Sequence, residues 1–153
     1  MIYQEAPNRE KTSFPYKKSL FLAGGITGCP DWQKEMIHLL NDEPILIYSP
    51  RRKNFPIHNP NAAYEQIKWE FDYLAKSDII SFWFCKETMC PIVLYELGRW
   101  ANSKKKIFIG MDPSYQRRQD VEIQTQLARP EIKIVYDLKD LSDQIKEVVV
   151  QFV

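Results

Sequence analysis

The sequence lacks long apolar runs and carries no excess of charge of either sign. Its longest uncharged apolar run covers residues 79–85, which is far too short to cross a lipid bilayer. Lysine and arginine number 21 and aspartate and glutamate 20, so the formal net charge is +1. Such a balance gives no long-range attraction to nucleic acid or to an anionic membrane. We therefore expect neither a nucleic-acid polymer nor a membrane as a partner.

Two further absences concern secretion and metal binding. Residues 1–14 are polar and mixed in charge, without the apolar core of a signal peptide. Cys29, Cys85 and Cys90 are odd in number and lack metal-ligand spacing, which favours a reducing compartment. We interpret each cysteine as a small buried or half-buried apolar side chain rather than a nucleophile. The expectation is a cytoplasmic protein that needs no metal and no cofactor.

The composition is typical of one globular domain. A chain of 153 residues with 44% hydrophobic and 27% charged residues is long enough to bury one full core. Residues 1–17 contain Pro7 and Pro15 and show no sustained periodicity, so we expect a loosely packed N-terminal arm. The remaining residues, 18–153, are expected to form a single α/β domain.

Short apolar runs alternate with amphipathic segments along this domain. The run at residues 79–84 is apolar throughout, which indicates a strand buried on both faces. The alternation predicts a parallel sheet of about five strands with helices on both faces, a flavodoxin-like or Rossmann-like three-layer sandwich. Residues 111–130 fit either a helix across the sheet edge or a loop with one helical turn. The expected strands are residues 18–23, 45–48, 79–84, 107–109 and 133–136, and the expected helices are 32–40, 62–76, 91–103 and 138–152.

The glycine-rich segment at residues 23–28 (AGGITG) follows the first expected strand of this domain. Glycines there let the backbone approach a ligand closely, and the next helix start offers free N–H groups. The segment has neither the GxGxxG order of a dinucleotide site nor the Gly-Lys-Ser/Thr end of a P-loop. A ligand-binding loop and a plain strand-to-helix turn both remain open.

Arg51 and Arg52 stand at the exit of the second expected strand of this domain. They could hold a phosphate, a sugar hydroxyl or a carboxylate. Two adjacent arginines are more often solvated surface charge, and the residues alone favour that alternative.

Three carboxylates, Glu70, Asp78 and Glu96, are expected around the buried strand at residues 79–84. Open α/β sheets bind ligands where strands exit into helix starts, so carboxylates near such an exit are candidates for covalent or acid–base chemistry. Glu70 shares a helix face with Ile67 and Leu74, which we expect to face the core. A carboxylate directed toward a core needs a partner or a function.

Glu96 lies in the helix that follows this strand, among mostly apolar neighbours. Partial burial would raise its pKa, and the nearby helix N-terminus would lower it. A surface ion pair with Arg99, three residues later, is the alternative to a functional role.

Three motifs together resemble the nucleoside 2-deoxyribosyltransferases and the related nucleoside 5′-monophosphate N-glycosidases, over about residues 18–109. They are LFLAGG at residues 20–25, Glu70 upstream of Asp78, and YELGR at residues 95–99. The resemblance implies that Glu96 is the nucleophile and that Glu70 stands where the family often has an Asp that contacts the nucleobase. It also implies a sugar and base pocket lined by Gly24, Gly25, Ile26 and Thr27.

The sequence departs from that family at two places. The family often has an aromatic hydroxyl where this chain has Gly25 and Ile26, and Cys90 replaces an acidic residue upstream of the nucleophile. These departures bear on substrate choice more than on mechanism.

The resulting hypothesis is a retaining transfer of a (2-deoxy)ribosyl group between nucleobases through a covalent intermediate on Glu96. Glu70 would assist the departing base, Trp32 and Phe55 would be stacking walls, and Arg51 would hold Glu96 or a substrate oxygen. The partners are a nucleoside and a free nucleobase, and the relatives imply a homo-oligomer, a dimer or larger.

Two alternatives remain open. A nucleoside 5′-monophosphate N-glycosidase would use the same Glu96 and would depend on residues 24–28, Arg51 and Arg52 for a phosphate. A non-catalytic nucleotide-binding module would not need Glu96.

Overall fold

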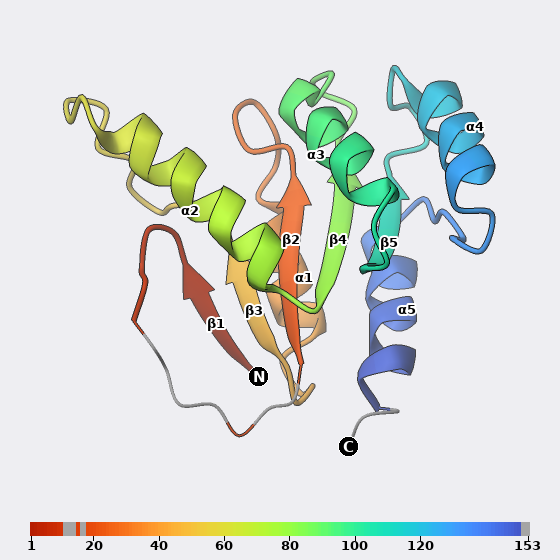
Figure 1. Cartoon of the computed structure of the whole chain (residues 1–153), viewed down its shortest axis with the longest axis horizontal. Coiled ribbons are helices and arrows are strands. Elements are labelled where there is room, and N and C mark those ends of the chain that lie inside the picture. Colours follow the sequence, from red (N-terminus) through yellow and green to blue (C-terminus); the bar gives the residue numbers. More distant parts are fainter. Residues whose placement is uncertain (11–14, 16–17, 151–153) are drawn as a thin grey trace.

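A parallel sheet of five strands forms the centre of the computed structural model, which describes residues 1–10, 15 and 18–150 (Figure 1). The strand order is β1-β3-β2-β4-β5, and every pair of neighbours is parallel. The strands are β1 (Ile2–Glu5), β2 (Ser19–Gly24), β3 (Leu46–Ser49), β4 (Ile79–Phe84) and β5 (Lys106–Met111). The helices are α1 (Trp32–Leu39), α2 (Ala62–Lys76), α3 (Pro91–Ala101), α4 (Arg118–Ala128) and α5 (Leu138–Val150).

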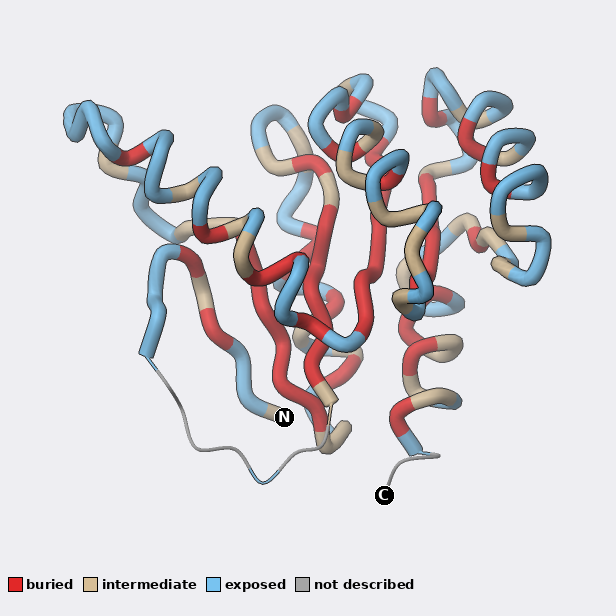
Figure 2. The backbone as a smooth tube through the Cα atoms, viewed as in Figure 1, coloured by how far each residue is buried: buried red, intermediate tan, exposed pale blue. Residues whose placement is uncertain are grey.

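Helices cover both faces of the sheet, as the three-layer prediction requires. In Figure 1, α2 and α3 lie on the near face, while α1 lies behind the strands and packs beside α5. All six residues of β4 are buried, which explains its unbroken apolar sequence. The central strands carry the core, and Figure 2 shows them as a continuous buried block. The predicted α/β three-layer fold is therefore confirmed.

The N-terminal segment differs from the expected loose arm, because Ile2–Glu5 forms the edge strand β1. It pairs in parallel with β3, from Ile2 opposite Leu46 to Glu5 opposite Ser49. The buried Gln4 side chain donates hydrogen bonds to the Tyr73 hydroxyl (3.2 Å) and to the Asn8 carbonyl oxygen (2.5 Å). An open sheet edge offers unpaired backbone groups to any short extended segment, which is why four residues suffice here. The rest of the expected arm includes residues 11–14 and 16–17, which lie outside the described residues.

The expected strand at residues 133–136 is wrong. Within the described part of the chain, its only pairing is an isolated bridge between Val135 and Gly110 of β5. The sheet thus has the expected number of strands, but the fifth is β1 on the opposite edge. Residues 111–130, for which two alternatives stood open, contain the helix α4, which lies next to α3.

Lys105, which immediately precedes β5, binds the C-terminal end of α2. Its ammonium group donates hydrogen bonds to the carbonyl oxygens of Leu74, Ala75 and Ser77, each at 2.7 Å. The last carbonyls of a helix have no partner within the helix, and a cation there also complements the helix dipole. This contact fixes the C-terminal end of the helix that carries Glu70.

No helix in the described part of the chain is long and apolar enough to span a membrane.

Candidate active site

A cavity of about 320 Å³ opens at the carboxyl end of β2, between the glycine-rich loop and the helices α2 and α3. Its walls come from four parts of the chain, in agreement with the rule that open parallel sheets bind ligands at this edge. β2 and its loop contribute Phe21, Ala23, Gly24, Gly25, Ile26 and Thr27, Pro50 follows β3, Glu70 comes from α2, and the segment leading into α3 contributes Thr88, Cys90, Pro91, Ile92, Val93 and Glu96.

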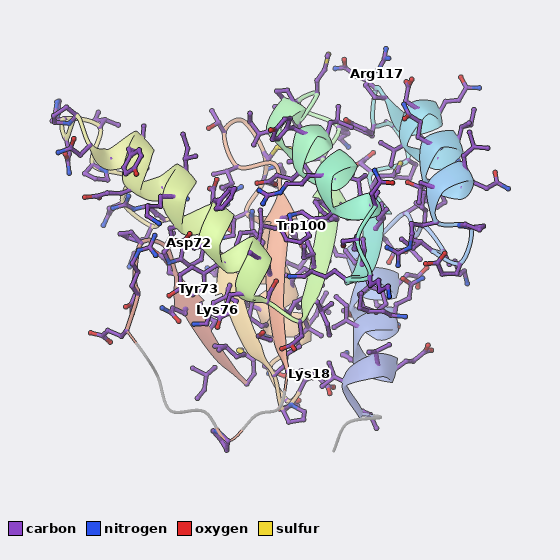
Figure 3. All side chains as sticks on the ribbon, viewed as in Figure 1. Lys18, Asp72, Tyr73, Lys76, Trp100 and Arg117 are labelled. Carbon is purple, nitrogen blue, oxygen red and sulfur yellow. A yellow bond between two sulfur atoms is a disulfide. The ribbon has the colours of Figure 1, made fainter. Side chains whose placement is uncertain are left out.

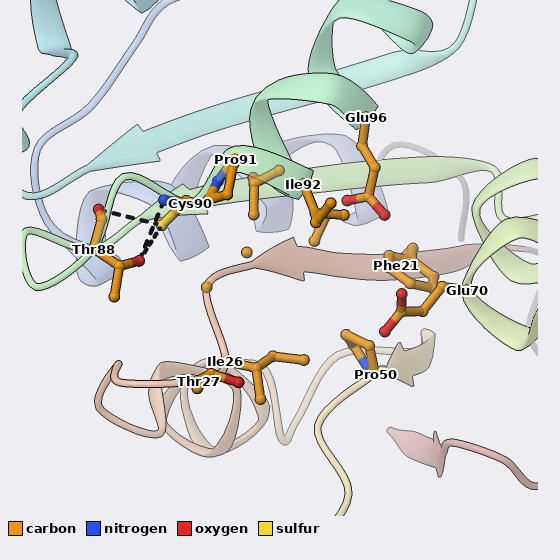
Figure 4. A pocket seen from close by; sticks show the side chains of 14 residues that line it. Phe21, Ile26, Thr27, Pro50, Glu70, Thr88, Cys90, Pro91, Ile92 and Glu96 are labelled. Atoms are coloured by element: carbon orange, nitrogen blue, oxygen red, sulfur yellow. Dashed lines mark hydrogen bonds between the residues drawn. The ribbon is translucent and has the colours of Figure 1, made fainter. Parts of the chain in front are cut away.

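Glu70 and Glu96 meet in this cavity. In Figure 4 the carboxyl groups of Glu70 and Glu96 project into the same space, beside Phe21 of β2. Both residues are half-buried. Gln66, one turn before Glu70 on α2, donates a hydrogen bond to the Glu70 carboxylate (2.8 Å) and another to the Pro50 carbonyl oxygen (2.7 Å). Gln66 therefore fixes the direction of the Glu70 side chain.

The environment of this pair raises both pKa values. Burial, and then the negative charge of Glu70, raise the pKa of Glu96 to about 8, although Arg99 opposes the shift. Burial also raises the pKa of Glu70, while the hydrogen bond from Gln66 lowers it. Two carboxylates that share a poorly hydrated space disfavour each other's ionisation, so the pair retains a proton near neutral pH.

The glycine-rich loop is packed too closely for side chains at its first two positions. A Cβ atom on Gly24 would lie 2.3 Å from Cζ2 of Trp32 and 2.6 Å from the Trp83 carbonyl oxygen. A Cβ atom on Gly25 would lie 2.4 Å from the Cys29 sulfur. The backbone of this loop packs against the protein on one side and lines the cavity on the other. The sugar and base pocket implied by the resemblance for residues 24–27 stays a prediction.

Arg51 supports the loop from behind and does not line the cavity with Glu96. Its guanidinium lies among oxygen atoms of the segment between β2 and α1 and also makes an ion pair with Asp31 (3.4 Å). Arg51 therefore holds the loop in shape, and the structure does not bring it to Glu96. It donates hydrogen bonds to the Gln33 side chain (2.9 Å) and to the carbonyl oxygens of Ile26 (3.2 Å), Cys29 (3.2 Å) and Pro30 (2.9 Å).

The two aromatic residues expected as stacking walls also lie away from this cavity. Trp32 is buried beneath the loop, where its indole N–H donates a hydrogen bond to the Gly25 carbonyl oxygen (2.9 Å). Phe55 is exposed and lies 5.3 Å from the guanidinium of Arg52. Neither ring is among the residues that line the space around Glu70 and Glu96.

A second cavity, of about 620 Å³, lies on the other side of Ile26 and contains both arginines. Arg52 Nη1 is buried there and has no hydrogen-bond partner among the described residues. The Arg52 residue also lines the second cavity, and a guanidinium there favours an anion.

Asp78, the third carboxylate expected beside β4, lies at the amino end of that strand and outside the cavity. It accepts hydrogen bonds from the backbone N–H and the hydroxyl of Ser19, both at 2.8 Å. Ile67 also differs from expectation, because its side chain is exposed, whereas Leu74 is buried as predicted. Two carboxylates, rather than three, meet at the site.

Thr88 and Cys90 are site residues that the sequence reasoning missed. They line the cavity from the loop between β4 and α3. The exit of a buried parallel strand was the signal that could have identified them.

The cysteines are also arranged differently from the interpretation as separate apolar side chains. Cys29 and Cys85 form a disulfide, and Cys90 lies against them. Cys85 and Cys90 are five residues apart, and the sequence reasoning placed neither of them beside Cys29.

A protein-family model described as nucleoside 2-deoxyribosyltransferase like matches residues 17–115, the part of the chain that contains every residue lining the first cavity. No curated protein matches the chain.

Proposed function

The chain belongs to the nucleoside 2-deoxyribosyltransferase-like family, and on that premise we propose that it transfers a 2-deoxyribosyl group from one nucleobase to another. The observation that carries the proposal is the pair of half-buried carboxyl groups, Glu70 and Glu96, in a cavity walled by bare loop backbone. Carboxyl pairs of this kind are the standard apparatus for cleaving glycosidic bonds. The substrates are a deoxynucleoside and a free nucleobase.

In the first step, the ionised Glu96 attacks C1′ of the sugar while the C1′–N bond to the base breaks. The electron pair of that bond passes to the base nitrogen, which takes a proton from Glu70. In the second step, the acceptor base attacks C1′ with a nitrogen electron pair, the ester bond to Glu96 breaks, and the acceptor returns a proton to Glu70. Two displacements at C1′ leave its configuration retained.

The raised pKa values supply the proton that this mechanism needs, but they place it on the nucleophile in the free enzyme. Near neutral pH the free enzyme holds a proton mainly on Glu96, whose pKa is about 8. Transfer of that proton to Glu70 leaves Glu96 ionised for attack and Glu70 protonated for the departing base. One proton shared by two carboxyl groups thus prepares a nucleophile and an acid together.

Apolar surfaces on opposite sides of the cavity suit a flat base. Ile26 projects from the loop and Ile92 from the first turn of α3, and Figure 4 shows them on facing walls. Gly24 and Gly25 line the cavity with their backbone, and the sugar would lie against it.

We further propose that a second copy of the chain covers the helices beside this cavity. Five large apolar or aromatic side chains on α2 and α3 are more than half exposed in the single chain. An exposed patch of this kind is typical of a subunit interface. The residues are Tyr64, Ile67, Phe71, Ile92 and Tyr95.

A specific observation favours a second candidate, a nucleoside 5′-monophosphate N-glycosidase. Arg51 and Arg52 line the adjoining cavity, which shares Ile26 with the first cavity, and this positive charge would bind a 5′-phosphate while the sugar lies next to Glu96. Water would then take the place of the acceptor base in the second step.

The experiment incubates the purified chain with a deoxynucleoside and a different free base and follows products by liquid chromatography. A new nucleoside indicates transfer, and free deoxyribose indicates hydrolysis. The same assay with a deoxynucleoside 5′-monophosphate identifies the second candidate. Ligand binding without either product would overturn both enzymatic proposals and leave a binding module.

A further inference from the structure

The three cysteines of the chain meet at one point behind the glycine-rich loop. Cys29 comes from the segment between β2 and α1, Cys85 follows β4, and Cys90 immediately precedes α3. Their sulfur atoms all lie within 4.8 Å of one another, and those of Cys85 and Cys90 are 3.7 Å apart. Cys85 and Cys90 are buried and Cys29 is half-buried.

The absence of a side chain at Gly25 provides the space for this cluster. A Cβ atom on Gly25 would lie 2.4 Å from the sulfur of Cys29, 2.9 Å from that of Cys85 and 3.0 Å from that of Cys90. All three sulfurs are therefore directed at the same side of one residue.

A hydroxyl group also faces two of the sulfurs. Cys90 is the N-cap of α3, and Thr88 lies two residues before it. The Thr88 hydroxyl oxygen lies 3.3 Å from the Cys90 sulfur and 3.8 Å from the Cys29 sulfur, within reach of a hydrogen bond to either.

We propose that, when its disulfide is reduced, this cluster is a zinc site with Cys29, Cys85 and Cys90 as ligands. Zinc binds thiolate sulfur at about 2.3 Å with tetrahedral geometry, which places two sulfur ligands about 3.8 Å apart. Cys85 and Cys90 already have this separation. Thiolates select zinc and other soft ions over magnesium or calcium, and a water molecule completes the fourth position.

Formation of the site is a balanced exchange. Two molecules of a thiol reductant become a disulfide as the Cys29–Cys85 bond takes up two electrons and two protons. Zn²⁺ then displaces one proton from each of the three thiols and forms three Zn–S bonds. The disulfide and the zinc site are alternative states of the same sulfurs.

A zinc ion here would link the segments that shape the cavity near Glu96. It would tie the glycine-rich loop, the end of β4 and the first turn of α3 to one another. The site does not rest on the proposed glycosyl transfer, because its ligands are a separate set of side chains from Glu70 and Glu96.

The test uses the full chain without an affinity tag, reduced by a water-soluble phosphine and titrated anaerobically with Co²⁺. The phosphine becomes a phosphine oxide and does not supply the competing thiolates that a dithiol would. We expect one equivalent of Co²⁺, with the visible bands of tetrahedral cobalt and a near-ultraviolet sulfur-to-cobalt band. Zn²⁺ should displace the cobalt and abolish both signals.

The single variants Cys29→Ser, Cys85→Ser and Cys90→Ser should each weaken Co²⁺ binding by at least about 100-fold. Loss of a residue that only supports a metal ligand lowers metal affinity by at most about 100-fold. The control variant replaces both exposed histidines, His38→Ala with His58→Ala, and should bind as the unmodified chain does. If a serine variant does not fold, alkylation of the unmodified reduced chain decides, because Zn²⁺ should protect all three thiols.

Three results would overturn the proposal. They are a disulfide that survives the phosphine in the folded chain, a reduced chain that binds neither ion stoichiometrically, and serine variants that bind as tightly as the unmodified chain.

Discussion

The carboxylates at the two ends of the sheet differ in their hydrogen-bond partners. At the amino end, Asp78 accepts two hydrogen bonds from Ser19 and lies 3.8 Å from the ammonium group of Lys18. At the carboxyl end, Glu96 has no hydrogen bond or ion pair with any described residue, and burial raises its pKa to about 8. A satisfied carboxylate stabilises the fold, whereas a poorly hydrated carboxylate without a hydrogen-bond partner costs stability, which supports the chemical role proposed for Glu96. This contrast teaches that partners and position, rather than the mere presence of an acidic residue, separate structural from functional groups.

The largest expected effect concerns Glu96, the proposed nucleophile. Glu96→Gln should lower the rate of deoxyribosyl transfer by more than about 1000-fold, because an amide cannot form the covalent intermediate. The measurement is the initial rate of new-nucleoside formation, with Glu65→Gln, an exposed position on α2, as the matched control. Near-normal transfer by Glu96→Gln would show that Glu96 is not the nucleophile, and the functional contrast with Asp78 would be lost.

Alanine substitutions at Gly24 and Gly98 should change the free energy of unfolding in opposite directions. Gly24→Ala should lower the free energy of unfolding by roughly 2–4 kcal/mol, because its Cβ would overlap Trp32 and the Trp83 backbone. Gly98→Ala, on α3 with nothing within 4 Å of its Cβ, should raise that free energy by up to about 1 kcal/mol. Urea denaturation of both variants checks this, and equal effects would contradict the close packing at the loop.

The pH dependence of the free energy of unfolding should show how much stability the ionisation of Glu96 removes. Its folded pKa of about 8 exceeds the ordinary value of 4.5, so between these values the folded chain holds a proton that the unfolded chain releases. The free energy of unfolding must therefore fall as pH rises through this range. Glu96→Gln, which cannot ionise, should be more stable than the unmodified chain by roughly 1–3 kcal/mol at pH 9 and similar to it at pH 4.

Denaturation curves at a series of pH values provide that measurement. Parallel curves for the two chains across the whole range would mean that the Glu96 carboxyl is hydrated in the folded state. Glu65→Gln should show no divergence with pH.

The smallest expected effect is at Asp78, whose carboxylate accepts hydrogen bonds from Ser19. Asp78→Asn should lower the free energy of unfolding by roughly 1–2 kcal/mol, because the amide weakens the charge-assisted hydrogen bonds from Ser19. The transfer rate per folded molecule should not change. A selective loss of turnover in a chain of unaltered stability would place Asp78 in the function after all.

Local sequence patterns were sufficient where burial alone decides structure. The unbroken apolar run of β4, the helices on either side and the loop backbone at Gly24 and Gly25 all follow from such patterns. β1 could not be predicted, since a four-residue strand is specified by the open edge of β3 and by the Gln4–Tyr73 contact. The meeting of Glu70 and Glu96 depends on helix placement across β2, for which the resemblance to a family was needed.

The positions of Trp32, Arg51 and the cysteines depended on contacts between distant segments. An indole or a guanidinium beside a glycine loop can support the backbone or face a ligand, and residue type does not distinguish these roles. Trp32 and Arg51 both bind carbonyl oxygens of the loop. The three cysteines converge only because the ends of β2 and β4 are neighbours in the sheet.

The contact of Lys105 with the last carbonyls of α2 has a mechanical consequence. Because Lys105 holds the C-terminal end of α2, any rigid rotation of this helix would displace its first turn, near Ala62, the most. Glu70, closer to the anchored end, would travel less than Gln66 and less again than Ala62. The anchored end of α2 thus keeps Glu70 nearly in place in the cavity when the first turn of the helix moves.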